Sequence, residues 1–246
     1  YIRLFWEVEL NKINSNYWAK CARGGGYRRY YGNDVNVILW TSEAKSHYRT
    51  DSIARIVPEY LQFKEGITWS YITSSIPSFR KLWNYELFEK AGTSIFIKDK
   101  NALNPLLGLL NSIVVKEVLN IINPTINFQV RDILSIPIKE EILSNHNINM
   151  LVNENISITK NDWDSFETSW DFKCHPLISV ISHNRAFIDD TIDIDLAECY
   201  TCWENECNER FNQLKANEEE LNRIFIEIYG LQDELTPEVE DKDVTV

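Results

Sequence analysis

The feature that most constrains the fold is a long amphipathic pattern near the end of the chain. Leu214, Leu221 and Ile228 fall seven residues apart, a spacing that places them on one face of a helix. Gly230 follows at the position where a helix C-cap usually stands. The spacing therefore predicts one helix over residues 195–229, and a helix of this length has to bury its apolar stripe against other elements.

A second helical pattern covers residues 101–122. Its apolar side chains recur at spacings of three and four, which predicts a single helix with one buried face. Asn123 and Pro124 end the pattern, because the residue before a proline is disfavoured in the helical conformation. The apolar positions are Leu103, Leu106, Leu107, Leu110, Val114, Val118 and Ile121.

The rest of the first half has the composition of strands. Residues 35–40 and 67–72 are rich in aromatic and β-branched residues, and the second run alternates apolar with polar positions. Residues 126–130 and 133–138 are also strand-like, with Pro137 marking an edge or exit. These runs predict a strand-rich first half that the helix at 101–122 interrupts.

Beyond Lys139 the chain becomes polar and acidic. Residues 143–160 are rich in Asn and are interpreted as loop with short helical pieces. Residues 162–176 carry four large aromatic rings and are expected to pack back onto another element. From Glu234 onward the sequence is an acidic tail.

The charge is divided unevenly between these two parts. Residues 1–139 hold 18 Lys and Arg against 12 Asp and Glu, a balance of +6, whereas residues 140–246 hold 7 against 25, a balance of −18. Two parts with such different surfaces predict two units. We expect an α+β chain with a strand-rich domain over 1–139 and a mostly helical acidic segment over 140–246 that packs back on the first.

Several classes of protein lack support. A chain that is 44% hydrophobic and 25% charged is neither disordered nor fibrous. It has no signal peptide and no apolar stretch long enough to span a bilayer, so we expect a cytoplasmic piece of a longer protein with no membrane partner. The five cysteines are odd in number and scattered, which favours reduced thiols.

No catalytic or metal-binding constellation stands out. Three thiols on one predicted helix (Cys199, Cys202 and Cys207) lack the second ligand pair of a zinc site. The four histidines sit apart, and an independent hydrolase has no supporting motif. The run that begins at Asn123 starts like the Asn-Pro-Pro-Tyr motif of amino-methyltransferases, but Thr125 replaces the second proline. We therefore assign no catalytic residue and no metal.

The most distinctive local feature is the run of residues 17–31, which holds four basic residues, four Tyr, one Trp and no acid. Three consecutive glycines let the backbone approach a ligand closely, and arginine forks suit phosphate or guanine. Basic residues interleaved with aromatics suit a nucleic-acid surface; a glycine hairpin with solvated arginines and core tyrosines is the alternative. The candidate DNA contacts here are Lys20, Arg23, Gly24, Gly25, Gly26, Tyr27, Arg28 and Arg29.

A second polar patch lies between residues 64 and 81. Its hydroxyl and basic side chains suit phosphate contacts, although an ordinary surface turn after a half-buried strand fits equally well. The candidate contacts in this patch are Lys64, Ser70, Ser74, Ser75, Arg80 and Lys81.

Blocks distributed over nearly the whole chain carry a family resemblance. They include Arg-Gly-Gly-Gly-Tyr-Arg-Arg at 23–29, Phe-Lys-Glu-Gly-Ile-Thr-Trp-Ser at 63–70, Asp-Trp-Asp-Ser-Phe-Glu-Thr-Ser-Trp-Asp-Phe at 162–172, and the segment 211–237. Together the blocks resemble the PglX family, the adenine-specific DNA methyltransferases of BREX phage-defence systems, which are related to fused restriction–modification methyltransferases.

The resemblance implies a target-recognition domain over 1–139 followed by a helical spacer over 140–246. It implies double-stranded DNA as partner. It also implies an upstream methyltransferase domain of the same protein that binds S-adenosylmethionine, with no cofactor in this chain. Residues 79–85 depart from the family pattern, which makes Arg80 and Lys81 candidate base readers. The alternative function is an interaction module whose acidic half, through residues 195–229, docks other defence-system proteins.

Overall fold

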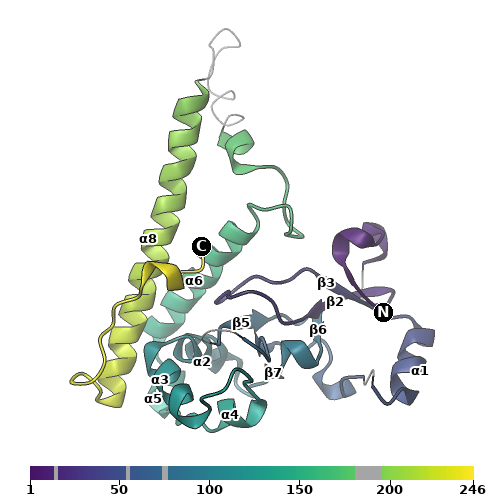
Figure 1. The fold of residues 1–246 in the computed structure, drawn as a ribbon, viewed down its shortest axis with the longest axis horizontal. Helices are drawn as coiled ribbons and strands as arrows, with labels where there is room; N and C mark the ends of the chain where they lie inside the picture. The colour runs from purple at the N-terminus through teal and green to yellow at the C-terminus, as the bar shows by residue number, and fades with distance from the viewer. Residues whose placement is uncertain (14–15, 54–55, 74–76, 181–194) are drawn as a thin grey trace.

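The computed structural model describes residues 1–13, 16–53, 56–73, 77–180 and 195–246. In these residues two small sheets lie beside a group of helices, and a long helical pair rises above the rest (Figure 1). The predicted α+β class is confirmed.

The first sheet contains the N-terminal strands in the order β1-β3-β2-β6. Its β2 and β6 strands pair in parallel, and its other pairs are antiparallel. The second sheet, in the order β5-β4-β7, is antiparallel throughout. The strands are β1 (Ile2–Leu4), β2 (Trp18–Ala22), β3 (Asn36–Leu39), β4 (Gly66–Trp69), β5 (Phe79–Leu82), β6 (Glu86–Phe88) and β7 (Ser94–Ile95). The strands predicted at 35–40 and 67–72 are present, the second shorter than expected.

Helices make up most of the remainder. The short α1 packs on the first sheet, and the others gather around the second sheet (Figure 1). Their bounds are α1 (Ser42–Thr50), α2 (Leu103–Leu110), α3 (Ile113–Ile122), α4 (Val130–Leu134), α5 (Glu140–Leu143), α6 (His146–Trp163) and α8 (Leu196–Tyr229).

The helix predicted over 101–122 is two helices, α2 and α3, bent by 74° at Asn111 and Ser112. The Asn111 side chain accepts a hydrogen bond from the Phe79 backbone N–H at 3.0 Å and donates one to the Phe79 carbonyl at 3.0 Å. The Ser112 hydroxyl accepts from the Val115 N–H and caps α3. Polar side chains that bond to the backbone in this way compete with a continuous helix.

Three further predictions about secondary structure were wrong. Residues 126–130 do not form a strand, and only an isolated bridge pairs Asn127 with Ile72. Residues 133–138 do not form a strand; α4 covers their first part, and its N-terminus is capped by Asp132, which accepts from the Gln129 N–H at 2.9 Å. Residues 143–160 are mostly one helix, α6, capped by Asn145. Ile148, Val152 and Ile156 form the buried stripe of α6 at intervals of four residues, and its asparagines obscured this pattern.

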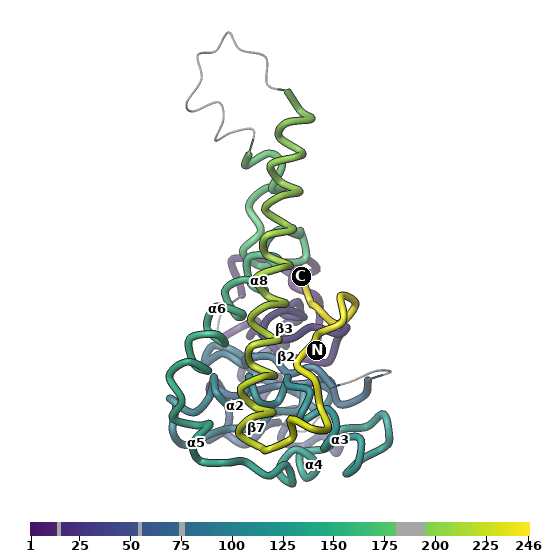
Figure 2. Tube along the Cα trace, turned by 90° about the vertical axis from the view of Figure 1, so that its left-hand side faces the viewer, coloured from purple at the N-terminus to yellow at the C-terminus, as the bar shows by residue number. Residues whose placement is uncertain are grey.

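The long C-terminal helix is confirmed as α8. Asp195 caps its start by accepting from the Ala197 N–H at 2.8 Å, and Gly230 ends it in the left-handed conformation with φ 73°. At 1.5 Å per residue its 34 residues span about 51 Å. Helices α6 and α8 pack side by side in opposite directions, and the first half of α8 stands clear of the sheets (Figures 1 and 2).

The main hydrophobic core is shared by both halves of the chain. It contains Ile67 and Phe79 from the second sheet, Leu107 from α2, Val152 from α6 and Phe225 from α8. The boundary predicted at residue 139 stays a prediction, but the buried cluster runs across it. A smaller cluster lies between the first sheet and α1.

Two segments of the acidic half return to the sheets. Trp170 stacks on Phe5 with ring centroids 4.2 Å apart, so the aromatic segment at 162–176 packs back as predicted. The C-terminal strap, residues 231–246, runs beside α8 toward the loop that follows β2 (Figure 2). Its Val239 and Val244 are buried in the main core.

Among the described residues, no single helix is both long and apolar enough to cross a membrane, and the α2–α3 pair reaches that apolarity only across its bend.

Candidate nucleic-acid interface

The run of glycines and arginines forms the glycine loop, residues 23–29, which links the two sheets. It begins at the end of β2 and leads into Tyr30, whose N–H donates to the Phe79 carbonyl at 2.9 Å. The Tyr30 carbonyl then accepts from the Lys81 N–H at 3.0 Å. Tyr30 has a φ of 63°, an uncommon conformation for a residue with a side chain. The loop is thus fixed at both ends. No helix lies between β2 and β3, a stretch that the structure describes throughout, so the loop does not form the glycine-rich strand-to-helix turn of a nucleotide site.

The glycine end of the loop lies at the surface and touches two other segments. The Gly25 N–H donates to the Ser70 hydroxyl at 3.0 Å, and this hydroxyl donates to the Gly25 carbonyl at 3.1 Å. A Cβ atom at Gly24 would lie 2.8 Å from the Ala91 carbonyl oxygen, so this position requires glycine. Gly25 and Gly26 are exposed.

Two residues that sequence reasoning missed belong to the same surface. Lys90 is exposed and lies over the Tyr71 ring, 5.9 Å from its centroid. The Tyr71 N–H donates to the Ala91 carbonyl at 3.1 Å. The sequence places neither residue near the loop, and only the pairing of distant segments brings them beside it. We define the glycine-loop surface as Arg23, Gly24, Gly25, Gly26, Tyr71 and Lys90; Ser70, which is 6% exposed, supports Gly25 from beneath.

Arg23 is the predicted arginine that faces solvent most. Its side chain is 49% exposed, and its Nε lies 3.3 Å from the Glu89 carboxylate. The pair is open on the Arg23 side, although the Glu89 oxygen that it meets is buried. Arg23 therefore has the solvent access that a phosphate contact requires.

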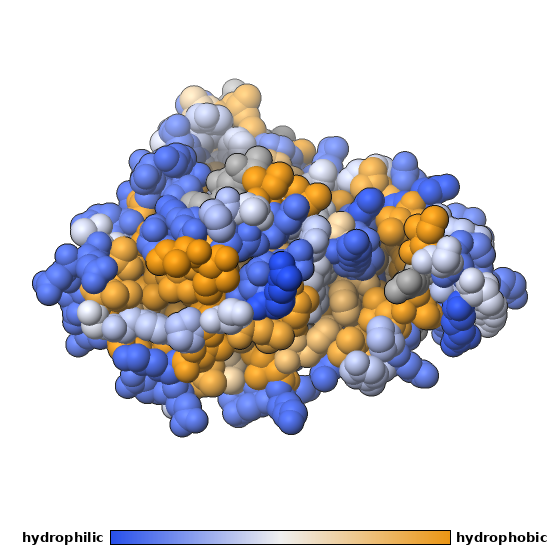
Figure 3. Space-filling model, turned by 60° about the horizontal axis from the view of Figure 1, so that its bottom comes forward, coloured by the Kyte–Doolittle hydropathy of each residue, from blue (hydrophilic) through white to orange (hydrophobic). Residues whose placement is uncertain are grey.

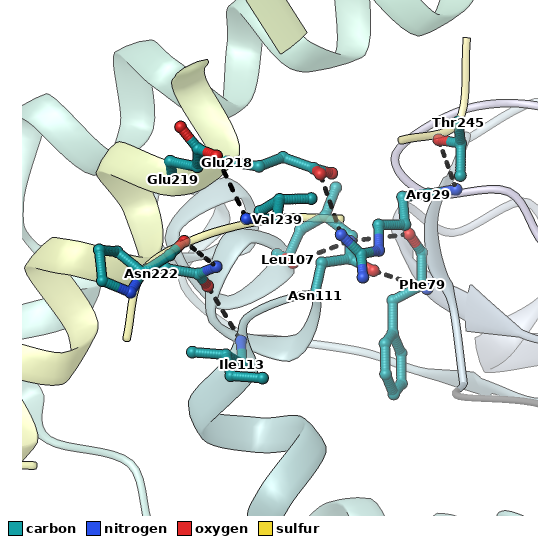
Figure 4. Close-up of polar contacts among 11 residues, drawn as sticks. Arg29, Phe79, Leu107, Asn111, Ile113, Glu218, Glu219, Asn222, Val239 and Thr245 are labelled. Carbon is teal, nitrogen blue, oxygen red and sulfur yellow. Dashed lines mark hydrogen bonds and ion pairs between the residues drawn. The ribbon is translucent and has the colours of Figure 1, made fainter. Parts of the chain in front are cut away.

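Arg29, only six residues further on, is buried. Its guanidinium pairs with Glu218 of α8 at 3.0 Å, and the exposed fractions of the two side chains are 9% and 2% (Figure 4). Its N–H donates to the Thr245 hydroxyl of the C-terminal strap at 3.3 Å. Burial alone would lower the pKa of Arg29, but the Glu218 carboxylate raises it above its ordinary value. Burial likewise raises the pKa of Glu218, against the opposing effect of Arg29.

Arg28 is held by the same half of the chain. Its Nη1 donates to the Asp162 carboxylate at 2.9 Å and to the Thr245 carbonyl at 2.8 Å. The guanidinium also lies over the Trp163 ring, 5.5 Å from its centroid. Arg28 and Arg29 together fasten the loop to α6, α8 and the C-terminal strap.

The remaining basic candidates are mostly engaged inside the fold. Arg80 is 2% exposed, and burial lowers its pKa to about 10 against the opposing charge of Glu86. Lys20 lies 3.6 Å from Asp34, and Lys81 lies 3.0 Å from Glu65. Arg29 and Arg80 are therefore not part of the exposed surface.

The last candidates are scattered. Lys64 is exposed and lies over the Phe96 ring, 5.5 Å from its centroid. Tyr27 is partly buried, and burial raises its pKa to about 12. Ser74 and Ser75 lie outside the described residues. Among the residues that the structure does describe, no group of three or more His, Cys, Asp and Glu side chains could hold a metal ion.

A cleft of about 270 Å³ lies between the α2–α3 junction and the C-terminal strap (Figure 4). Asn222 closes one side: its side chain accepts from the Ile113 N–H at 2.9 Å and donates to the Pro237 carbonyl at 3.1 Å. Four acidic residues of the strap line the cleft, which disfavours a phosphate there. These residues are Glu234, Glu238, Glu240 and Asp243.

No protein-family model matches the chain. The adenine-specific methyltransferase PglX of Lacticaseibacillus casei (strain Zhang) is 36% identical over 263 residues, which cover 100% of this chain and 21% of that relative. The adenine-specific methyltransferase BrxX of Escherichia coli O9:H4 (strain HS) is 27% identical over 243 residues, which cover 96% of this chain and 19% of that relative.

The chain thus spans about one fifth of the length of the curated relatives it matches. The match extends over both halves, so it includes the glycine loop as well as α6, α8 and the C-terminal strap. The resemblance expected from the sequence blocks is confirmed: over its whole length, this chain is similar to the C-terminal fifth of PglX-type adenine-specific methyltransferases.

Proposed function

We propose that this chain is the target-recognition part of a longer adenine-specific DNA methyltransferase of a BREX-type phage-defence system. It contacts duplex DNA in the cytoplasm. The observation that carries the proposal is the 36% identity to PglX over the whole chain. In this proposal the S-adenosylmethionine site and the catalytic residues belong to polypeptide outside these 246 residues, and this chain contributes the grip on the target.

The glycine-loop surface supports DNA contact. Arg23 and Lys90 supply cationic donors, and the exposed glycines leave the backbone accessible. Such groups make most protein–phosphate contacts and fix the position of a protein on the duplex. Tyr71 adds an aromatic ring at the same place.

The buried arginines have a supporting role in this proposal. A binding loop works best when rigid elements hold it in one geometry, because less conformational entropy is lost on binding. Arg28 and Arg29 fix the far end of the glycine loop to the C-terminal half through Asp162 and Glu218. The glycine end is therefore presented by a scaffold that is ordered before DNA arrives.

The test uses the 246-residue chain and not a 1–139 fragment, because truncation at 139 would expose a core that both halves share. Fluorescence anisotropy measures its affinity for duplex DNA between 50 and 200 mM salt. Two phosphate contacts predict a log–log slope of about −1.8. If the net charge of −12 only repels DNA, the chain shows no affinity for the duplex, or an affinity that increases as salt screens the repulsion. Binding that does not weaken with salt would contradict the proposal.

A second candidate is interaction with other defence-system proteins through α8. One face of the second half of α8 is buried in this chain, whereas Leu196 and Tyr200 near its start are 59% and 50% exposed. Large exposed apolar side chains at the end of a projecting helix are typical of protein contacts. This candidate predicts that Leu196→Ser with Tyr200→Ser removes association with those proteins, and that the chain shows no salt-sensitive duplex binding.

A further inference from the structure

An apolar face lies at the end of the molecule formed by α3, α4 and the connection between them. The exposed Arg131 of α4, 3.6 Å from the Asp132 carboxylate, lies beside it. Figure 3, which brings this end forward, shows apolar side chains over much of it. Ile121 is 83% exposed and Leu134 is 71% exposed. We define the α3–α4 face as Ile72, Ile121, Ile122, Ile126, Val130 and Leu134, each of which is at least 36% exposed.

The backbone beneath this face is well ordered. The Thr73 N–H donates to the Ile126 carbonyl at 3.0 Å, and the Phe128 N–H donates to the Tyr71 carbonyl at 3.0 Å. The Asn123 side chain donates to the Asn127 carbonyl and to the Asp132 carboxylate, both at 2.7 Å. The apolar side chains are therefore displayed on a fixed surface that does not need to rearrange before contact.

The chemistry of the face disfavours nucleic acid as its occupant, because Arg131 is the one basic residue between positions 120 and 134. Residues 120–130 contain no charged residue, in a chain that is 25% charged. Binding of nucleic acid depends on cations that neutralise phosphates. The cores of protein–protein contacts, in contrast, are depleted in charge and rich in large apolar side chains.

We propose that the α3–α4 face is covered, in the longer methyltransferase polypeptide, by an apolar surface of the part that lies outside this chain. The inference rests on the proposed function in one respect, that such a polypeptide exists. The relatives are about five times as long as this chain. A polypeptide of that length has about four fifths of its residues outside this chain, and these can supply the surface that covers the face. A second copy of the chain fits less well, because two molecules of net charge −12 repel each other.

The test measures amide hydrogen exchange of peptides from residues 119–134, in the longer polypeptide and in the 246-residue chain. Coverage of the face predicts exchange roughly tenfold slower in the longer polypeptide. The variant Ile121→Ser with Leu134→Ser removes this slowing. Both residues are exposed, so the variant keeps the unfolding temperature of the 246-residue chain. The matched control is Ile53→Ser with Tyr60→Ser, which alters exposed side chains outside the face (92% and 76% exposed) and leaves the slowing intact.

Equal exchange rates in the two polypeptides would overturn the proposal, as would slowing that persists in the Ile121→Ser, Leu134→Ser variant. Sedimentation of the 246-residue chain tests whether a second copy covers the face. If the chain is a dimer that the variant dissociates, and the exchange rates in the two polypeptides are equal, the occupant is another molecule of this chain. Duplex binding is measured separately. Loss of DNA binding with the slowing preserved refutes the DNA proposal alone, whereas DNA binding without slowing refutes only the present inference.

Discussion

The two ends of the glycine loop carry the same kind of residue in opposite environments. Arg23, beside the glycines, is half exposed and pairs loosely with Glu89 from the neighbouring segment. Arg29 is almost fully buried against Glu218, which lies 189 residues away in the sequence. A run of basic residues thus does not reveal which of them are available to a ligand. The acid that meets each one decides this.

The same comparison holds for the two halves of the chain. The first half has an excess of positive charge and the second a larger excess of negative charge. In the fold, Asp162 and Glu218 of the second half neutralise Arg28 and Arg29 of the first. Part of the opposite charge of the two halves is therefore neutralised in ion pairs within the molecule, and only the remaining charged side chains can contact partners.

The largest expected effect comes from breaking the buried end of the loop. Arg29→Ala leaves the Glu218 carboxylate buried without a counter-ion, and removing one partner of a buried pair costs about 3–5 kcal/mol. Urea unfolding of the variant measures this loss. The double variant Arg29→Met with Glu218→Met removes both charges and is expected to recover most of the stability. A single-variant loss below about 1 kcal/mol would show that the pair is not buried as described.

A smaller loss is expected at the α2–α3 junction, which holds the strand that the loop pairs with. Asn111→Ala removes the hydrogen-bond acceptor of the buried Phe79 N–H, whereas the Phe79 carbonyl keeps its bond from the Tyr30 N–H. One orphaned buried group costs about 1–3 kcal/mol, so the free energy of unfolding should fall by about this amount. Asn120→Ala, on the exposed side of α3, is the control and should change it by less than about 0.5 kcal/mol. Equal effects of the two substitutions would contradict the role given to Asn111.

The third prediction concerns two carboxyls buried between the loop and β6. Burial raises the pKa of Glu86 well above its usual range and also raises that of Asp34. As the pH rises above about 4, the unfolded chain loses these protons before the folded chain does, so this pair makes stability fall with rising pH.

Glu86→Gln removes one of the two carboxyls whose proton is held more tightly in the folded chain. The stability of the variant relative to the native chain should therefore increase as the pH rises from about 4 to 7. Urea unfolding at several pH values measures the difference. Glu43→Gln provides the comparison, because Glu43 is exposed and its pKa is lowered instead. The stability of this variant relative to the native chain should decrease as the pH rises. A flat difference for Glu86→Gln would contradict the account.

Local patterns in the sequence were sufficient for α8 and for the α+β class. The apolar stripe and the Gly230 cap lie within the helix itself, so no distant residue is needed to specify them. The break at Asn111 was missed because its partner is Phe79 on β5. α6 was missed because asparagines are spread along it, including the fully buried Asn155, although its apolar stripe has the regular spacing of a helix.

The site was predictable to a lesser extent. The glycine loop and Ser70 were identified, and the structure brings them together. The burial of Arg29 and Arg80 was not predictable, because it depends on helices and strands that meet only in three dimensions. Lys90 and Tyr71 join the surface through a backbone hydrogen bond between Tyr71 and Ala91, which no local pattern indicates.

The most direct test of the division between an exposed and a buried end is the salt dependence of duplex binding for two double variants. Arg23→Ala with Lys90→Ala removes the cations of the glycine-loop surface. Arg223→Ala with Lys242→Ala removes the same charge from exposed side chains on α8 and the C-terminal strap. We predict that the first variant flattens the log–log slope by about 1.8, at about 0.9 per phosphate contact, and that the second leaves the slope unchanged. Equal effects of the two variants would show that only net charge matters and would contradict the assignment of DNA contact to the glycine-loop surface.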